Sequence, residues 1–283
     1  MGSAEIVRED VATVGYTTHL LRSGEVGAPP VLLLHGGGVG AQAEANWMRT
    51  LPTLGEQVQA IAPDLVGFGA TTHPDPVPYG PAAWLALRVE QLVALLDHYG
   101  IERAHLVGNS LGGALTLNFV LAHPERVSTI ILMGSAGAPF KPGEALMRLL
   151  GFYGDPTPEN MRAILEDFVY DLDGFGGVDA LIEARVRDAM RPEVKRSFEA
   201  MFRDPEGQPV RELALPPERV QSIQARALIV HGRDDRIIPM DASLWLLEQL
   251  PHGRPARVRR VRALGDARAL ARLQPARARP RQS

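Results

Sequence analysis

Short apolar runs alternate along the chain with longer segments in which apolar residues recur every three or four positions. The short runs are bounded by turn residues and are typical of buried strands. They are VLLLH (31–35), VQAIAPD (58–64), AHLVGNS (104–110), VSTIILMG (127–134) and ARALIVHG (225–232). Residues 84–100 and 111–124 have helical spacing and end at Gly and Pro. This alternation predicts a mainly parallel sheet covered on both faces, led by an antiparallel strand or hairpin within residues 5–21.

Residues 140–215 interrupt the alternation. Amphipathic segments follow one another there without an apolar run that would predict a strand, and the strand pattern returns at residue 225. We therefore predict a helical insertion between two strands. The resulting division is a first part of the core (1–139), the insertion (140–215), a second part of the core (216–252) and an Arg- and Ala-rich tail (253–283).

Composition supports a folded chain and excludes several classes of protein. Of 283 residues, 45% are hydrophobic and 22% are charged, which is enough to bury a core. No apolar run reaches the roughly 18 residues of a membrane-spanning helix, and the acidic N-terminus lacks the apolar segment of a signal peptide. The chain has no Cys, which excludes disulfides, thiolate metal ligands and cysteine nucleophiles. We expect a cytoplasmic protein.

The net charge of −3 conceals an uneven distribution of charge. Residues 252–283 hold ten Arg and one Asp, whereas residues 1–251 hold 20 basic and 32 acidic residues. The body of the chain therefore lacks the electrostatic footprint of nucleic-acid binding, and only the tail carries a basic excess.

The strongest chemical signal is the segment Gly108-Asn109-Ser110-Leu111-Gly112, which fits G-x-S-x-G. A predicted strand precedes it and a predicted helix follows it, as a nucleophile elbow requires. The small residues at its ends permit a tight strand-to-helix turn. That turn projects the serine hydroxyl above the carboxyl end of the strand.

A glycine-rich segment, His35-Gly36-Gly37-Gly38, follows another predicted strand and matches the HGGG type of oxyanion motif. Glycines let the backbone approach a substrate oxygen and donate an N–H to it. The second donor would be the N–H of Leu111, the residue after the nucleophile. His35 precedes the loop and is expected to be structural.

Two acidic residues follow the strand at 225–232. An acid is expected at this position to orient and stabilise a catalytic imidazolium. Asp235 is the better candidate, whereas Asp234 and Arg236 are expected to form a solvated charge cluster.

Together these motifs resemble the α/β-hydrolases of the meta-cleavage product hydrolase family, above all the branch that acts on 2-hydroxymuconic semialdehyde and its 6-alkyl or 6-aryl relatives. The resembling segments are LLLHGGGVG, ANWMRTLPTL, VQAIAPDLVGFGAT, AHLVGNSLGG, RVSTIILMGSAG, SFEAMF and LIVHGRDDRIIP. One departure is Val39, where the family often has Pro. The resemblance implies the α/β-hydrolase fold, a doubly wound and mostly parallel sheet, with residues 140–215 as a helical lid.

The resemblance assigns the catalytic roles by position. Ser110 is the nucleophile and Asp235 is the acid of the triad. Gly37 and Leu111 are the oxyanion donors.

The resemblance also assigns the binding residues. Asn46 and Asn109 line the polar part of the pocket, and Arg185 matches the arginine that meets the 2-oxo/carboxylate end of the substrate. The alternative for Arg185 is a solvated helix charge. Trp47, Trp84 and the Met and Phe residues of the insertion are expected to belong to the core.

The implied activity is hydrolysis of a C–C bond in a vinylogous 1,5-diketone of the 2-hydroxy-6-oxohexa-2,4-dienoate type, formed by meta-cleavage of an aromatic ring during aromatic hydrocarbon catabolism. No metal or organic cofactor is implied. The expected partner is a small-molecule substrate, with no nucleic acid and no membrane. Whether the chain forms a homo-oligomer is left open by the sequence. The alternatives are a carboxylesterase or lactonase on the same fold and a catalytically silent ligand-binding protein.

The catalytic base that this family uses is missing from the sequence. A serine hydroxyl needs a neighbouring base to attack at neutral pH. In the family the base is the His of a G-H-W segment after the last strand, and the resemblance places that His at Ala263. The last His of the chain is His252, before the final strand can begin, and His231 is only a weak substitute. The chain as written is therefore expected to be impaired.

A shifted reading frame would explain the tail. With GC-rich codons, residues 257–265 read one base later give Val-Phe-Gly-Gly-Cys-Gly-His-Trp, which resembles the family's V-F-G-x-C-G-H-W segment. An Arg-, Ala- and Pro-rich tail is also what a GC-rich gene yields out of frame. We therefore interpret residues 253–283 as frameshifted, and the alternative is an evolved basic arm that binds nucleic acid.

Overall fold

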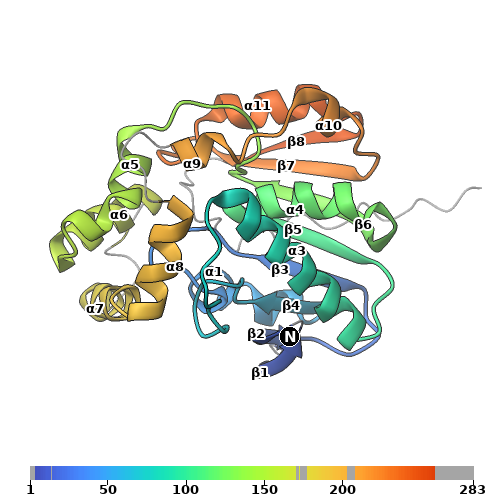
Figure 1. Cartoon of the computed structure of the whole chain (residues 1–283). Coiled ribbons are helices and arrows are strands. Elements are labelled where there is room, and N and C mark those ends of the chain that lie inside the picture. Colours follow the sequence, from blue (N-terminus) through green and yellow to red (C-terminus); the bar gives the residue numbers. More distant parts are fainter. Residues whose placement is uncertain (1–3, 14, 170–171, 173–176, 203–207, 259–283) are drawn as a thin grey trace, which may run out of the picture.

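The computed structural model describes residues 4–13, 15–169, 172, 177–202 and 208–258. Of these, residues 256–258 are described by their backbone alone. Within these residues one sheet has the strand order β1-β2-β4-β3-β5-β6-β7-β8 (Figure 1). The strands are β1 (Ile6–Thr13), β2 (Tyr16–Ser23), β3 (Pro30–Leu34), β4 (Gln59–Pro63), β5 (Ala104–Asn109), β6 (Val127–Met133), β7 (Arg226–Gly232) and β8 (Gly253–Val258). β1 and β2 pair antiparallel, as do β2 and β4, and the other neighbours are parallel. The predicted mainly parallel sheet with an antiparallel start is confirmed.

The strand order places a topological switch point at β3. The chain passes from β3 to β4 on one side of it and then returns to β5 on the other side. In open α/β sheets, ligands bind beyond the carboxyl ends of the strands at such a point. The glycine-rich segment 35–38 directly follows β3, and the G-x-S-x-G segment 108–112 spans the end of β5.

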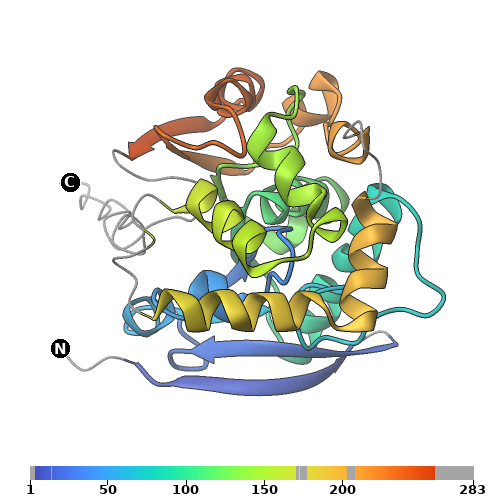
Figure 2. The same cartoon turned by 90° about the vertical axis from the view of Figure 1, so that its left-hand side faces the viewer.

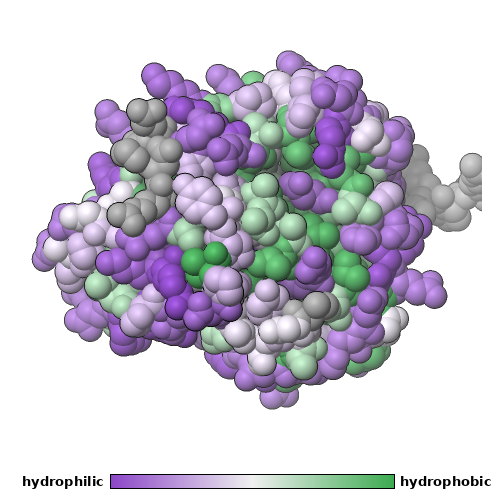
Figure 3. Space-filling model, viewed as in Figure 1, coloured by the Kyte–Doolittle hydropathy of each residue, from purple (hydrophilic) through white to green (hydrophobic). Residues whose placement is uncertain are grey.

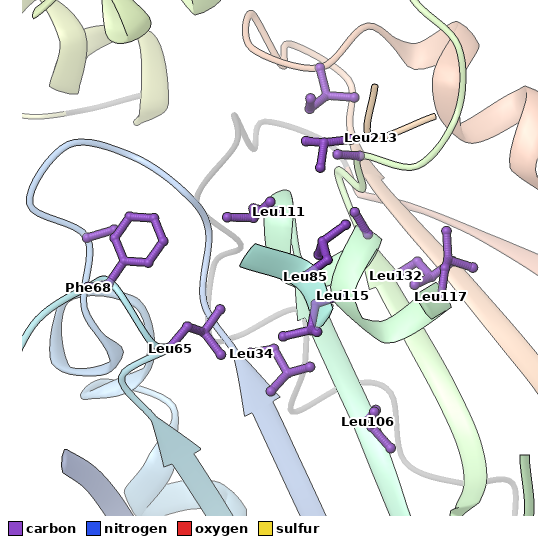
Figure 4. Close-up of a cluster of buried hydrophobic side chains, with 14 of the residues drawn as sticks. Leu34, Leu65, Phe68, Leu85, Leu106, Leu111, Leu115, Leu117, Leu132 and Leu213 are labelled. Carbon is purple, nitrogen blue, oxygen red and sulfur yellow. The ribbon is translucent and has the colours of Figure 1, made fainter. Parts of the chain in front are cut away.

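Alternate side chains of the strands pack into two separate cores. On one face, Leu34, Leu106 and Leu132 point toward α3 (Pro81–His98) and α4 (Leu111–Ala122), as the labelled leucines of Figure 4 show. On the other face, Leu33 and Val107 pack with α1 (Ala43–Trp47) and α2 (Leu51–Leu54). Because successive strand residues face opposite sides, helices must cover both faces, which makes the sheet doubly wound.

Helices occupy the described residues between β6 and β7. They are α5 (Glu144–Leu150), a 3₁₀ turn (Phe152–Gly154), α6 (Pro158–Phe168), α7 (Val178–Ala189), α8 (Pro192–Phe202), α9 (Gln208–Arg211) and α10 (Pro217–Gln221). We call α5 to α9 the lid helices; they lie within the predicted insertion, whereas α10 lies just beyond it. Figure 2 shows them together on one side of the molecule, and their outer surface in Figure 3 is mostly hydrophilic. Their apolar faces therefore turn inward, as amphipathic helices require.

The last strand lies inside the predicted tail. β8 pairs in parallel with β7 from Gly253, and α11 (Met240–Gln249) connects the two strands. The first six residues of the tail are thus an edge strand of the sheet, whereas residues 259–283, including position 263, lie outside the described residues. Among the described residues, no helix is long and apolar enough to cross a membrane.

Candidate active site

Ser110 occupies the tight turn between β5 and α4. Its φ of 52° and ψ of −114° make it the one described non-glycine residue with a positive φ. A conformation of this kind costs about 1–3 kcal/mol and persists only where the surroundings impose it. Four backbone hydrogen bonds do so here. The Ser110 N–H donates to the Met133 carbonyl (2.9 Å), and the Ser110 carbonyl accepts from the N–H groups of Gly113 (2.9 Å), Ala114 (3.4 Å) and Ala136 (3.0 Å).

The two glycines of the elbow have a steric explanation. A Cβ on Gly108 would overlap the carbonyl of Gly112 and the hydroxyl of Thr116, and a Cβ on Gly112 would overlap the carbonyl of Leu34. The turn can therefore form only where both positions lack a side chain.

The glycine loop after β3 lies directly against this elbow. A Cβ on Gly37 would come within 2.7 Å of Leu111 Cδ2, and one on Gly36 would lie 3.4 Å from Ser110 Cβ. Gly37, Ser110 and Leu111 line the same cavity. The structure thus brings together the three positions that the sequence assigned to nucleophile and oxyanion hole.

His35 connects the glycine loop to the backbone at Leu65 through two hydrogen bonds. Its Nδ1 donates to the Gly36 carbonyl (2.7 Å), and its Nε2 accepts from the Leu65 N–H (3.0 Å). Complete burial lowers the pKa of His35 to about 3, so the ring is neutral at physiological pH. Both ring nitrogens are used within the protein, which agrees with a structural role.

Asp235 lies in the turn after β7, with its carboxylate at the carboxyl end of the sheet. Its Oδ1 accepts from the N–H groups of Ile237 (2.8 Å) and Ile238 (3.0 Å). A Cβ on Gly134, just after β6, would lie 2.9 Å from Asp235 Oδ2. Burial raises the pKa of Asp235, while His231 and the two N–H donors act in the opposite direction.

Both ring nitrogens of His231 have hydrogen-bond partners other than Ser110. Its Nδ1 lies 2.6 Å from the hydroxyl of Ser243, and its Nε2 lies 3.1 Å from the Ile238 carbonyl and 3.7 Å from Asp235 Oδ2. Burial lowers the pKa of His231. Among the described residues, no hydrogen bond joins this ring to Ser110.

One cavity lies between the elbow and the lid helices, with about 790 Å³ of empty space including its open mouth. All the predicted site residues except Asp235 line it, namely Gly37, Asn46, Asn109, Ser110, Leu111 and Arg185. Asp235 itself does not line the cavity. Ile237 and Ile238, whose N–H groups donate to its carboxylate, line the cavity next to it.

Two asparagines meet at the polar end of the cavity. The Asn109 amide donates to Asn46 Oδ1 (3.0 Å), which also accepts the N–H of Gly36 (3.3 Å). Asn109 Oδ1 is buried without a partner. The pair fixes the entry to the glycine loop and leaves one acceptor available at the site.

Arg185 reaches the polar end from lid helix α7. Its Nη1 donates to the carbonyls of Val39 (3.3 Å) and Gly40 (3.1 Å), and its Nε is buried without a partner. Burial lowers the pKa of Arg185 to about 10, so the guanidinium keeps its charge at neutral pH. The side chain faces the cavity and the residues that follow the glycine loop, and the alternative of a solvated helix charge is wrong.

The lid supplies an apolar wall that the sequence reasoning missed. Met161 and Phe202 belong to the hydrophobic core and Phe168 packs against it, as expected, and all three also line the cavity. Further lid residues in the wall are Leu146, Leu149, Leu150, Ile164, Leu165, Val210 and Leu213. An apolar residue on an amphipathic helix carries no sequence signal that separates a cavity wall from a core. Trp47 and Trp84 are buried in the core, as expected.

The expected solvated cluster of Asp234 and Arg236 after β7 is confirmed for the exposure of Arg236, whose side chain is 55% exposed, but the two residues have different partners. Asp234 forms an ion pair with Arg233 (3.3 Å) near the surface, although Asp234 Oδ2 is buried. Arg236 pairs with the buried carboxylate of Asp167 on lid helix α6 (3.3 Å). Nothing in the local sequence reveals that partner.

Known proteins match this chain over most of its length. A model of the alpha/beta hydrolase fold family matches residues 29–268. The chain is 40% identical over 223 residues to 2-hydroxy-6-oxo-2,4-heptadienoate hydrolase of Pseudomonas putida, covering 78% of each. It is 38% identical over 246 residues to 2-hydroxymuconate semialdehyde hydrolase of a Pseudomonas species, covering 87% of this chain and 83% of the relative. The structure of 2-hydroxy-6-oxo-6-phenylhexa-2,4-dienoate hydrolase from a Rhodococcus species superposes with a TM-score of 0.90 at 38% identity, covering 96% of this chain and 98% of the other.

Proposed function

Because this chain belongs to the α/β-hydrolase fold family, and within it to the meta-cleavage product hydrolases, we propose that it acts on products of aromatic ring cleavage. The substrate is a vinylogous 1,5-diketone of the 2-hydroxy-6-oxohexa-2,4-dienoate type, and the bond hydrolysed is a C–C bond. The observation that carries the proposal is that Ser110 and Arg185 both line the polar end of the same largely apolar cavity.

Arg185 binds the acidic end of the substrate. Its Nη1 is held by the carbonyls of Val39 and Gly40, which orients the guanidinium, and its buried Nε is available to a carboxylate or 2-oxo oxygen. A charge-assisted hydrogen bond of this kind is about twice as strong as a neutral one. The asparagine pair Asn46 and Asn109 completes the polar end.

The reaction proceeds in two stages. The bound dienol first ketonises, which moves a proton to C5 and makes the C5–C6 bond breakable. Ser110 Oγ, or a water that it activates, then attacks the C6 carbonyl, and the N–H groups of Gly37 and Leu111 stabilise the oxyanion. As the C5–C6 bond breaks, one water is consumed; C6 leaves as a carboxylic acid and the other fragment as a five-carbon 2-hydroxydienoate. In the first stage the 2-hydroxyl loses its proton as C5 gains one. The chain's own residues are assigned substrate binding, nucleophilic attack and oxyanion stabilisation in this scheme, whereas the proton transfers, including that of the general base, are left without an assigned residue.

The base of the triad is absent from the chain as written, and we propose that its activity is impaired for this reason. The resemblance places that His at Ala263, and His231 has partners other than Ser110. Asp235 then has a buried carboxylate without the imidazolium that it would stabilise. A frameshift in the 253–283 region accounts for both the loss of the His and the ten arginines of residues 252–283.

The partner in this proposal is a small-molecule substrate, with no cofactor assigned. The absence of Cys supports a reducing cytoplasm as the compartment.

The experiment that tests the proposal compares two substrates with the full chain. Turnover of a 2-hydroxy-6-oxo-2,4-dienoate, followed by the loss of its visible absorption, is measured beside hydrolysis of a p-nitrophenyl ester of a short carboxylic acid. We expect the dienoate to be bound and cleaved in preference, and the Ser110→Ala variant to bind it without cleavage. Preferential hydrolysis of the ester, with no dienoate binding, would instead support a carboxylesterase.

A further inference from the structure

Asp167 is a buried carboxylate on lid helix α6 with two cationic partners. Its side chain is 7% exposed. Oδ2 lies 3.0 Å from Arg148 Nη1 on α5, and Oδ1 lies 3.3 Å from Arg236 Nη1 in the turn after β7. A buried charge is costly unless it is paired and hydrogen-bonded. Arrangements of the lid that separate Asp167 from these arginines are therefore disfavoured.

Arg236 stands inside the turn that holds the proposed triad acid. It directly follows Asp235 and directly precedes Ile237, whose N–H donates to Asp235 Oδ1 (2.8 Å); the Ile238 N–H donates to the same oxygen (3.0 Å). The Arg236 side chain is 55% exposed, and its ion pair with Asp167 joins α6 to the backbone between the proposed triad acid and its donors.

The other side of α6 forms part of the cavity wall. Met161, Ile164, Leu165 and Phe168 of this helix line the cavity, as do Ile237 and Ile238 of the turn. Helix α6 thus contributes to the apolar wall and is joined through Asp167 to the turn that carries Asp235.

We propose that Asp167 is a positioning residue that ties the closure of lid helix α6 over the substrate to the correct setting of Asp235. The carboxylate joins two lid helices to the turn, so that the lid and the acid occupy their working positions together. The proposal rests on the proposed function in taking Asp235 as the triad acid, but the mechanical link itself is a property of the fold.

The experiment measures hydrogen exchange of the Ile237 and Ile238 amides in the full chain, because Asp235 protects both. Asp167→Asn keeps the size of the side chain and removes its charge. We expect exchange at both amides to accelerate about tenfold, the effect of losing roughly 1.4 kcal/mol of interaction. Glu159→Gln, an exposed acid on the first turn of the same helix, is the matched control and should leave exchange unchanged.

Two further variants separate the link to the turn from a general stabilisation of the lid. Arg236→Gln should reproduce the effect of Asp167→Asn, and the double variant should exceed neither single variant, because both remove the same contact. Arg148→Gln, which breaks only the contact within the lid, should leave the Ile237 and Ile238 amides protected. Additive effects, or faster exchange in α6 with unchanged Ile237 and Ile238, would overturn the proposal.

Affinity for a 2-hydroxy-6-oxo-2,4-dienoate, measured in the same variants, distinguishes this proposal from the proposed function. We expect Asp167→Asn to weaken binding several-fold while Glu159→Gln does not. Absence of dienoate binding in the unmodified chain, with the exchange effect present, would reject the substrate and leave the link between lid and acid intact.

Discussion

Replacing Arg185 with Gln tests the polar end of the cavity. The side chain is held by the Val39 and Gly40 carbonyls, and its Nε is buried without a partner. Gln keeps a polar side chain but removes the charge that a substrate carboxylate would meet. Removing one member of a buried, hydrogen-bonded charge pair costs about 2–5 kcal/mol, because the other charge is left unpaired. The mouth of the cavity is open to solvent, so we take the low end, about 2–3 kcal/mol, which is a roughly 30- to 150-fold loss of affinity.

The assay is a titration of dienoate binding by visible absorption, carried out in a Ser110→Ala background so that cleavage does not interfere. Arg187→Gln, an exposed arginine on the same helix, is the matched control and should bind as the parent does. Loss of the two hydrogen bonds to the loop should lower the free energy of unfolding of Arg185→Gln by about 1–2 kcal/mol, which a urea titration measures. Unchanged dienoate affinity in Arg185→Gln would refute the assignment of Arg185 to the acidic end of the substrate.

Three further predictions concern the base, the elbow and the response to acid. Restoring the V-F-G-x-C-G-H-W reading of the tail should raise turnover of the dienoate by roughly 10⁴-fold, and equal turnover by both chains would mean that another group serves Ser110. Gly112→Ala should cost about 3 kcal/mol or more of unfolding free energy, because its Cβ would overlap the Leu34 carbonyl; Gly143→Ala, where nothing lies within 4 Å, is the control, and similar urea midpoints for the two variants would contradict the steric argument. Burial lowers the pKa of His35 from 6.5 to about 3, so the unfolded chain binds this proton first; its contribution to stability is complete above pH 6.5 and is lost as the pH falls from 6.5 toward 3, by up to about 1.4 kcal/mol per pH unit. Urea titrations across that range should therefore show a shallower pH dependence for His35→Gln than for the parent, and parallel curves would reject this explanation.

The sequence by itself predicted the central strands, the elbow and the glycine loop, because apolar runs and glycine spacing are local patterns, whereas β8 lies in the segment that the sequence marked as an aberrant tail. Gly108 and Gly112 are required by contacts within one strand-to-helix turn and with the adjoining strand. The apolar runs predicted the central strands, since a strand covered on both faces needs apolar residues at successive positions. The positions of Gly37, Ser110 and Leu111 at one cavity followed from the fold class that these patterns indicate.

Only the tertiary structure decided what the lid does. Whether Arg185 faces solvent or the cavity, and whether the core residues Met161, Phe168 and Phe202 also border the cavity, depends on how α6, α7 and α8 pack on loops far away in the sequence. The hydrophobic effect that drives this packing is non-directional, so an apolar stripe predicts burial but not the surface that it is buried against. The ion pair between Arg236 and Asp167 likewise depends on how the lid packs, because the two residues are far apart in the sequence. The sequence predicts a solvated side chain for Arg236, and the side chain is 55% exposed, but only the fold shows that its ion-pair partner is a buried carboxylate on the lid.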